Sequence, residues 1–365
     1  MYNEFGISDK AKNLVLKAEK SLTEEFKKID DMCDINSLKV LKAFSDNKIS
    51  EVHFGSTTGY GYDDIGRDAI ERVFSSVLES EDAIVRSQFI SGSHALCVCL
   101  FAFLRPGDLM LSITGTPYDT LHEVIGIKEN KSSLKSFGIK YDEIDLLDND
   151  FDYEKIENYI KNNKVKLIEI QRSRGYSTRK SLTIEKIEKA IKAIREVNTD
   201  VIIMVDNCYG ELVETKEPGH AGADIVVGSL MKNLGGGIAS TGGYVAGRAD
   251  LIHMVAERLT APGIGKNQGA NFNQNNAFFK GIFMAPSAVN SAIKTAIFSS
   301  WMLEKLGYNN VAPKWNDQRT DIIQTVELGN KDNLVKFAQG IQEASPIDSF
   351  VRVMPAPLGG KWHMD

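Results

Sequence analysis

From about residue 82 onward, short apolar runs alternate with segments in which apolar residues recur every three or four positions. The short runs are typical of buried strands, and the periodic segments are typical of amphipathic helices. Their alternation predicts successive βαβ units around a large, mostly parallel, seven-stranded sheet. The predicted strands are 83–89, 109–114, 136–144, 166–171, 201–205, 224–228 and 243–246. The predicted helices between them are 92–103, 117–125, 152–161, 184–197 and 248–259.

The pattern differs at both ends of the chain. Residues 8–44 are polar with periodic apolar positions, which predicts a helical N-terminal arm. After residue 260 the chain becomes loop-like, and 284–306 is predicted to form one long helix. We therefore divide the chain into an arm (1–55), a large domain (56–283), and an interdomain helix with a small C-terminal domain (284–365).

Length and composition narrow the function classes. A chain of 365 residues with 42% hydrophobic and 25% charged residues has room for a large domain and a smaller one. The net charge of −6, with lysines scattered among acidic residues, argues against nucleic acid as a partner. No apolar segment reaches the roughly 18 residues of a membrane span, and no signal peptide is recognisable, so we expect a cytoplasmic protein. The four cysteines and six histidines lack metal-ligand spacing, so we expect no metal site.

The strongest chemical signal joins the ends of two predicted strands. Asp206 directly follows the run 201–205, and Lys232 follows the run 224–228. In open parallel sheets, ligands bind beyond the carboxyl ends of the strands. Pyridoxal phosphate (PLP) needs a lysine that holds it covalently and a carboxylate against its ring nitrogen. A turn-capping Asp206 and a surface Lys232 are the alternatives, but Ser229 and the glycines 235–237 favour a phosphate-binding site.

A second anion site is predicted in the segment 91–95, Ser-Gly-Ser-His-Ala, which follows a strand and opens an apolar helix. Helix N-termini present free N–H groups, and Gly92 and Ser93 would allow a phosphate to approach them. A serine cap without a ligand is the alternative. His94 is interpreted as a base, a neighbour of the cofactor ring or a packed side chain.

Two groups of tyrosines are weaker candidates. Tyr118 follows the strand 109–114, where its ring could stack on a pyridine ring or be an ordinary half-buried side chain. Tyr60 and Tyr62 lie in a Gly-Tyr-Gly-Tyr segment near Arg67, and such segments are commonly plain turns.

Several segments, taken in order, resemble one known group: the PLP-dependent, methionine gamma-lyase-like family of aluminium-resistance proteins related to cystathionine beta-lyase. The matching segments are 91–95 (SGSHA), 115–121 (GTPYDTL), 171–177 (QRSRGYS), 205–211 (VDNCYGE), 228–233 (GSLMKN) and 260–265 (TAPGIG). The resemblance implies the fold type I architecture of PLP-dependent transferases, with a smaller C-terminal α/β domain. It also implies a homodimer or homotetramer with shared active sites.

The resemblance also implies a role for each candidate residue. Lys232 would hold PLP and Asp206 its ring nitrogen, while Tyr118 would cover the ring face. The phosphate would be bound by Gly92, Ser93 and Ser229, with Tyr60 or Tyr62 reaching the phosphate of a neighbouring subunit. Arg172 and Arg174 would contact the cofactor or a substrate carboxylate, although a surface salt-bridge pair is equally consistent with the sequence.

Two departures from the family pattern qualify the expected activity. Met231 stands where related lyases often have a threonine, which removes one phosphate ligand. The ending 351–365 does not resemble the family, so we expect an incomplete small domain without the arginine that binds a substrate carboxylate.

The predicted function is elimination of a sulfur leaving group, at the β or γ position, from an amino acid such as cystathionine or methionine. After the substrate displaces it, Lys232 would remove the α-proton as a general base. Amino-group transfer or aldol cleavage on the same scaffold is one alternative. A catalytically impaired PLP-binding stress or metal-resistance protein is the other.

Overall fold

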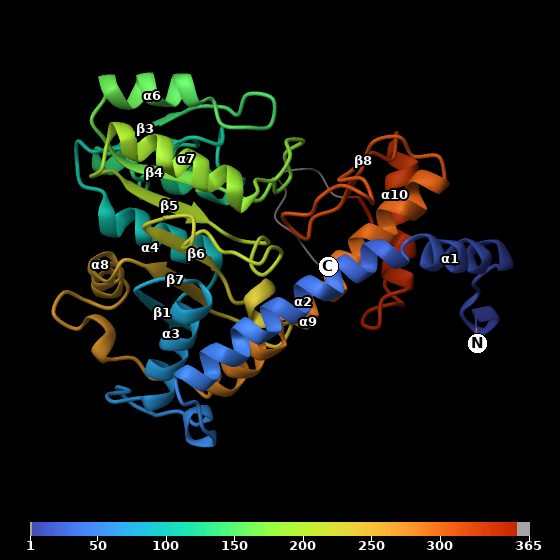
Figure 1. The fold of residues 1–365 in the computed structure, drawn as a ribbon, viewed down its shortest axis with the longest axis horizontal. Helices are drawn as coiled ribbons and strands as arrows, with labels where there is room; N and C mark the ends of the chain where they lie inside the picture. The colour runs from blue at the N-terminus through green and yellow to red at the C-terminus, as the bar shows by residue number, and fades with distance from the viewer. Residues whose placement is uncertain (1, 356–365) are drawn as a thin grey trace.

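A seven-stranded sheet forms the centre of the computed structural model, which describes residues 2–355 (Figure 1). Its strand order is β1-β7-β6-β5-β4-β2-β3. The strands are β1 (Asp82–Arg86), β2 (Leu109–Ser112), β3 (Lys140–Glu143), β4 (Val165–Gln171), β5 (Ile202–Asp206), β6 (Ile225–Ser229) and β7 (Gly243–Gly247). Only β7 runs antiparallel to its neighbours, β6 and β1, within this sheet. The predicted large, mostly parallel sheet is therefore confirmed.

Helices cover both faces of the sheet because successive strand residues point to opposite sides. Val227 of β6 packs with α4 and α8, whereas the preceding Val226 packs with α3 and the long helix α9 (Gln274–Lys305). The side chains of α6 and α7 cover β2, β4 and β5 on the same side as α3. These helices are α3 (Ile65–Val77), α4 (Gly92–Phe103), α6 (Tyr153–Asn162), α7 (Ile184–Val197) and α8 (Ala249–Leu259).

Two predicted elements are shorter than expected. The strand expected over 136–144 is confined to β3, because a 3-10 turn over Lys135–Phe137 and Gly138, with φ of 80°, precede it. The helix expected over 117–125 is a 3-10 turn, Asp119–Leu121, followed by the single turn α5 (His122–Ile125). Gly126 ends α5 in the left-handed conformation.

The N-terminal segment is helical, as predicted, and forms α1 (Asp9–Ser21) and α2 (Thr23–Asp46). Helix α2 lies along the long helix α9 (Gln274–Lys305), which also packs on α3 (Figure 1). The predicted helix over 284–306 thus begins ten residues earlier. The boundary that we drew at residue 284 falls inside α9, and the division into domains stays a prediction.

Beyond α9 the chain forms a two-stranded antiparallel sheet of β8 (Val311–Ala312) and β9 (Thr325–Val326), then α10 (Lys331–Glu343). Figure 1 shows α1, β8 and α10 on the side away from the large sheet. The ending singled out above, 351–365, lies partly outside the described residues, which stop at 355.

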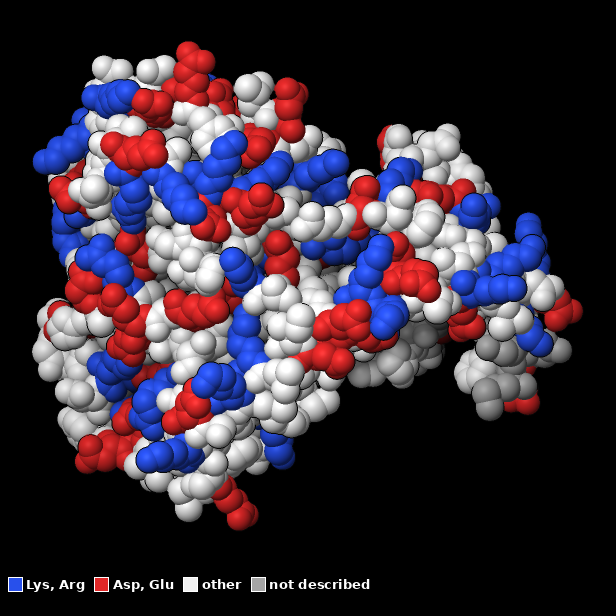
Figure 2. All heavy atoms as spheres, viewed as in Figure 1, with Lys and Arg blue, Asp and Glu red and all other residues white. Residues whose placement is uncertain are grey.

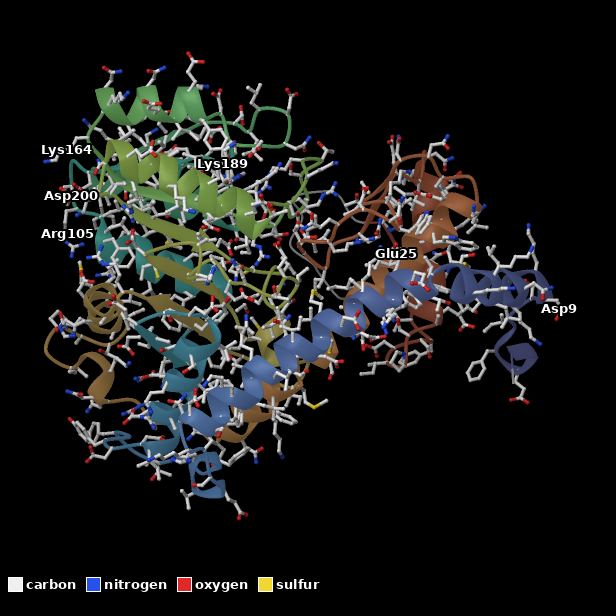
Figure 3. The ribbon with its side chains drawn as sticks, viewed as in Figure 1. Asp9, Glu25, Arg105, Lys164, Lys189 and Asp200 are labelled. Carbon is white, nitrogen blue, oxygen red and sulfur yellow. The ribbon has the colours of Figure 1, made fainter. Side chains whose placement is uncertain are left out.

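Charged side chains of both signs are interspersed on the face shown in Figure 2. Labelled side chains such as Asp9, Lys164 and Asp200 project outward from their elements (Figure 3). Among the described helices, none combines the length and apolar character needed to cross a bilayer.

Candidate functional site

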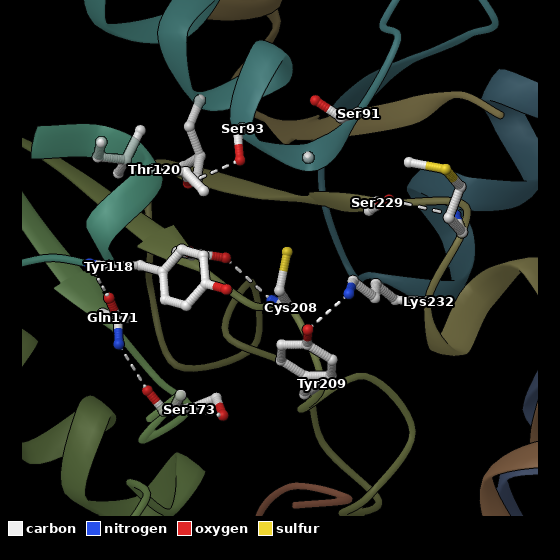
Figure 4. Close-up of a pocket in the computed structure, with 16 residues that line it drawn as sticks. Ser91, Ser93, Tyr118, Thr120, Gln171, Ser173, Cys208, Tyr209, Ser229 and Lys232 are labelled. Carbon is white, nitrogen blue, oxygen red and sulfur yellow. Dashed lines mark hydrogen bonds between the residues drawn. The ribbon is translucent and has the colours of Figure 1, made fainter. Parts of the chain in front are cut away.

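A cavity of about 250 Å³ lies at the carboxyl ends of β4, β5 and β6, facing the N-terminus of α4 (Figure 4). The final residues of these three strands, Gln171, Asp206 and Ser229, all line it. The other lining residues are Ser91, Gly92, Ser93, Leu96, Tyr118, Thr120, Leu121, Ser173, Gly175, Cys208, Tyr209, Met231 and Lys232. The predicted residues Gly92, Ser93, Tyr118, Asp206, Ser229 and Lys232 therefore come together in one cavity.

Lys232 reaches this cavity from the turn that follows β6. Its backbone N–H donates to the carbonyl of Ser229 (3.2 Å), which reverses the chain directly after the strand. Its Nζ donates to the hydroxyl of Tyr209 (2.5 Å) and lies 4.3 Å from the centre of that ring. The amine is thus held at the cavity by a hydrogen bond and a cation–π contact.

Asp206 is the last residue of β5 and is only 7% exposed. Its carboxylate accepts the backbone N–H of Cys208 (3.0 Å). Burial raises the pKa of Asp206, against hydrogen bonds from Cys208 and the charge of Lys232, which lower it. No lysine, arginine or histidine of the described residues forms a salt bridge with this carboxylate at 4.0 Å or less.

A second buried carboxyl, Glu169, points to the same face of the sheet two residues before Gln171. Its Oε2 accepts the hydroxyl of Ser112 (2.9 Å), and Oε1 has no partner among the described residues. Burial raises the pKa of Glu169 to about 8, and the negative charge of Asp206 adds to that shift. Burial beside Asp206 therefore favours the protonated form of Glu169.

The N-terminus of α4 forms the opposite wall. The side chain of Ser91 caps the helix by accepting the N–H of His94 (3.1 Å). A Cβ added at Gly92 would lie 3.1 Å from the Cβ of Ser229 and 3.2 Å from the Sγ of Cys208. A side chain at this position would require its neighbours to shift by a few tenths of an ångström, because α4 begins so close to the ends of β5 and β6.

Tyr118 and Gln171 form the side of the cavity. The backbone N–H of Tyr118 donates to Oε1 of Gln171 (2.7 Å), whose Nε2 donates to the carbonyl of Ser173 (2.9 Å). The ring of Tyr118 stacks on Tyr176, with centroids 5.6 Å apart and planes 27° apart. Burial, followed by the contact with Tyr176, raises the pKa of Tyr118, so its hydroxyl keeps its proton.

Three predicted site residues do not line this cavity. His94 is half-buried, its Nδ1 accepts the N–H of Ile90 (3.2 Å), and it packs against Phe89. Tyr60 and Tyr62 are 75% and 60% exposed in the loop before α3. Their predicted contact with a neighbouring subunit's phosphate stays a prediction.

The two predicted arginines also lie outside the lining of the cavity. Arg172 is fully buried, and its guanidinium donates to Asn207 Oδ1 and the Gly210 carbonyl (2.8 Å each) and to Glu214 Oε2 (2.7 Å). Arg174 donates to the carbonyls of Ser177 and Thr178 (3.2 and 3.4 Å) within its own loop. Contacts of either arginine with a cofactor or substrate stay a prediction.

Sequence reasoning missed Tyr209, which makes the direct contact with Lys232. The available signal was its place in the segment 205–211, three residues after Asp206. It also missed Ser173, Thr120 and Cys208, since small polar residues after a strand have no distinctive spacing.

The comparisons with known proteins agree with this site. A family model described as methionine gamma-lyase matches residues 11–363. The protein YnbB of Bacillus subtilis is 44% identical over 363 residues, which are 99% of this chain and 86% of YnbB. An L-methionine gamma-lyase of Pseudomonas deceptionensis is 24% identical over 234 residues, 61% of this chain and 51% of that enzyme.

Solved structures give the same result. A carbon-sulfur lyase involved in aluminum resistance from Clostridium novyi NT has a TM-score of 0.94 and 45% identity, covering 98% of this chain and 85% of its own. The pyridoxal-5'-phosphate dependent protein YhfS of Escherichia coli has a TM-score of 0.63 at 16% identity, covering 87% of this chain and 81% of its own. At that identity the likeness shows the fold alone, and it confirms the predicted fold type I architecture.

Proposed function

The chain belongs to the methionine gamma-lyase family, as its motifs predicted, and on that premise we propose that it is a PLP-dependent carbon–sulfur lyase acting on a sulfur-containing amino acid. The family and its structural neighbours support a PLP-dependent, carbon–sulfur lyase-like function. The observation that carries the proposal is one cavity lined by the amine of Lys232 and the buried carboxylate of Asp206.

The residues of the cavity fit PLP. The carboxylate of Asp206 is buried without a salt bridge to a described residue, so a protonated ring nitrogen would supply the missing partner. The close approach at Gly92 brings the first turn of α4 to the end of β6, where helix N–H groups and the hydroxyl of Ser229 can hold a phosphate. The phenol ring of Tyr118 would cover one face of the cofactor ring.

When bound, PLP withdraws electron density from the α-carbon of an amino acid and so stabilises loss of its α-proton. The side chains supply the rest of the chemistry. Lys232 would hold the cofactor, and its freed amine would take the α-proton as a general base. Asp206 would keep the ring nitrogen protonated, and Tyr209 holds the lysine amine at the cavity.

The test is an absorbance spectrum of the purified chain with PLP, followed by addition of L-cystathionine or L-methionine. We expect the band of lysine-bound cofactor, then a thiol, ammonia, and pyruvate or 2-oxobutyrate in equal amounts. Lys232→Ala should lose the band while staying folded. Lys189→Ala, on the outer helix α7, should keep it. A band without any released thiol would contradict the lyase proposal, and amino-group transfer would identify another PLP reaction.

We also propose that the loop carrying Tyr60 and Tyr62 contacts a second copy of the chain. This loop pairs with the segment before α9, since the N–H of Gly269 donates to the carbonyl of Tyr60 (2.8 Å). Tyr60, Tyr62 and the nearby Phe272 are each at least 60% exposed, which is typical of a surface that binds a partner. Light scattering on the purified chain should give a dimer or tetramer, and a monomeric Tyr62→Asp variant would locate the contact.

A further inference from the structure

A segment from beyond the long helix α9 returns to the cavity of Lys232. Residues 319–324 lie between β8 and β9, in the C-terminal part of the chain. Two hydrogen bonds join this segment to residues that line the cavity, Ser173 and Tyr209. Figure 4 shows a C-terminal segment passing beneath both residues. The wall of the cavity therefore depends on a part of the chain that is distant in sequence.

Asp321 fixes this segment in place. Its Oδ2 accepts the hydroxyls of Ser173 (2.7 Å) and Ser181, and its Oδ1 accepts the N–H of Ile323 (3.0 Å). The Asp321 side chain is only 1% exposed, so water does not compete for these hydrogen bonds. Both carboxylate oxygens are thus bound, one to the loop after β4 and one to the segment itself.

Cationic side chains surround the same carboxylate. Burial lowers the pKa values of Arg174, Arg179 and Arg319, and the charge of Asp321 opposes the shift in each. Asp317 acts on Arg319 in the same way. A buried carboxylate that is hydrogen-bonded and lies near cations is costly to move, because any displacement would leave buried charges uncompensated. The charges therefore add to the hydrogen bonds that hold the segment.

The residue after Asp321 holds the loop that carries Tyr209. The N–H of Ile322 donates to the carbonyl of Tyr209 (3.2 Å). Tyr209 has a φ of 71°, in the left-handed region, where a side chain crowds the following carbonyl oxygen. A residue stays in such a conformation only where surrounding contacts hold it there. The bond from Ile322 is one of these contacts.

Tyr209 in turn holds the amine of Lys232. Its hydroxyl accepts the hydrogen bond of Nζ (2.5 Å), and Nζ lies 4.3 Å from the centre of its ring. Asp321 does not line the cavity. It therefore acts on Lys232 through the residues that it holds, and not by direct contact.

We propose that Asp321 is a positioning residue for Lys232, because it fixes the segment 319–324 on the loop after β4 and so keeps Tyr209 in contact with the amine. Before PLP is bound, Asp321 limits the motion of the loop that carries Tyr209. During PLP binding, it speeds attachment by keeping the amine in place, and this second part rests on the proposed function.

Amide hydrogen exchange on the purified chain, before PLP is added, tests the first part. Asp321→Ala should speed exchange at Ile322 and across residues 207–213 about tenfold, because the hydrogen bonds that fix the segment are lost. Ser181→Ala removes one of these bonds outside the lining of the cavity and should have a smaller effect in the same direction. Asp317→Ala is the control, since it removes an exposed carboxylate from the same connection and should leave exchange unchanged.

Stopped-flow absorbance tests the second part. Asp321→Ala should slow attachment of PLP about as much as Tyr209→Phe, and the variant with both changes should be no slower than Tyr209→Phe alone. A general loss of structure would instead add to the effect of Tyr209→Phe. Asp321→Asn should restore most of the lost rate, because its amide can form hydrogen bonds with the same serines and with Ile323.

Unchanged exchange at Ile322 in the folded variants, or fully additive effects of Asp321→Ala and Tyr209→Phe, would overturn the proposal. If Asp321→Ala does not fold, Ser181→Ala decides by the same two measurements. If the parent chain forms no band of lysine-bound cofactor, the lyase proposal fails, and exchange at Ile322 and over 207–213 decides whether Asp321 holds the loop.

Discussion

Replacing Arg172 by methionine tests whether this arginine serves the fold or the substrate. The guanidinium is fully buried and donates to Asn207, Gly210 and Glu214. It also lies 3.8 Å from Oε2 of Glu217, which is itself fully buried. Methionine would fill much of the space but would remove the main counter-charge of the Glu217 carboxylate and leave only the weaker influence of Lys39.

The expected loss of stability is large. Removing one partner of a buried ion pair costs about 3–5 kcal/mol, because a buried charge is left uncompensated. The exposed pair of Lys192 and Glu188 on α7 is the matched control, and Lys192→Met should change the free energy of unfolding little, because solvent screens an exposed pair. The loss of unfolding free energy should therefore be several-fold larger for Arg172→Met.

Urea denaturation of the cofactor-loaded chain measures both changes. Glu217→Gln, added to Arg172→Met, should restore part of the lost stability because it removes the unpaired charge. The loop that carries Tyr209 should also loosen, so cofactor attachment should weaken in the single variant. If Arg172→Met is as stable as Lys192→Met and only raises KM, the reasoning is wrong and Arg172 binds substrate.

Three further predictions follow from the cavity. Glu169→Gln should flatten the pH dependence of the free energy of unfolding. Burial raises the pKa of Glu169 from 4.5 to about 8, so in the parent chain this free energy falls by about 1.4 kcal/mol per pH unit as the pH rises between these values. If the urea midpoint changes with pH equally in the parent chain and in Glu169→Gln between pH 5 and 8, this reasoning is wrong. Tyr209→Phe should slow attachment of PLP to Lys232 about tenfold, because the variant loses one hydrogen bond worth about 1.4 kcal/mol. An unchanged attachment rate in stopped-flow absorbance would refute this. Gly92→Ala should weaken PLP binding at least tenfold in a titration, because the added Cβ would lie 3.1 Å from the side chain of Ser229 at the end of β6. Gly340→Ala is the control and should leave PLP binding unchanged, because open space surrounds Gly340.

The sheet could be predicted from the sequence because its strands are buried on both faces. Such strands are continuous apolar runs, as in Ile202–Asp206, where every residue is buried. The edge strand β3 alternates exposed and half-buried residues, so its limits were predicted poorly. The start of α9 was missed because Asn273, in the left-handed conformation, opens a helix whose first turn is polar.

The meeting of Asp206 and Lys232 was also predictable, because parallel strands bring their carboxyl ends to one edge of the sheet. The direction of an individual side chain beyond that edge was not. Tyr209 has a φ of 71°, in the left-handed region. Such a φ is uncommon for residues other than glycine, so a tyrosine in the sequence does not predict it. Its hydroxyl accepts the hydrogen bond of Lys232 only once this loop has folded against the turn after β6.

The arginines after β4 show most clearly where sequence reasoning ends. Arg172 and Arg174 stand two residues apart, and the sequence offers the same roles for both. The fold separates them: Arg172 turns to Glu214 and Glu217 in the loop after β5, whereas Arg174 joins Arg319 from beyond α9. In both cases some partners are distant in sequence: Arg172 pairs with carboxylates after β5, whereas Arg174 lies near the charge of Asp321 and donates to carbonyls of its own loop. The same residue type therefore joins two loops through ion pairs at one position and closes its own loop at the other.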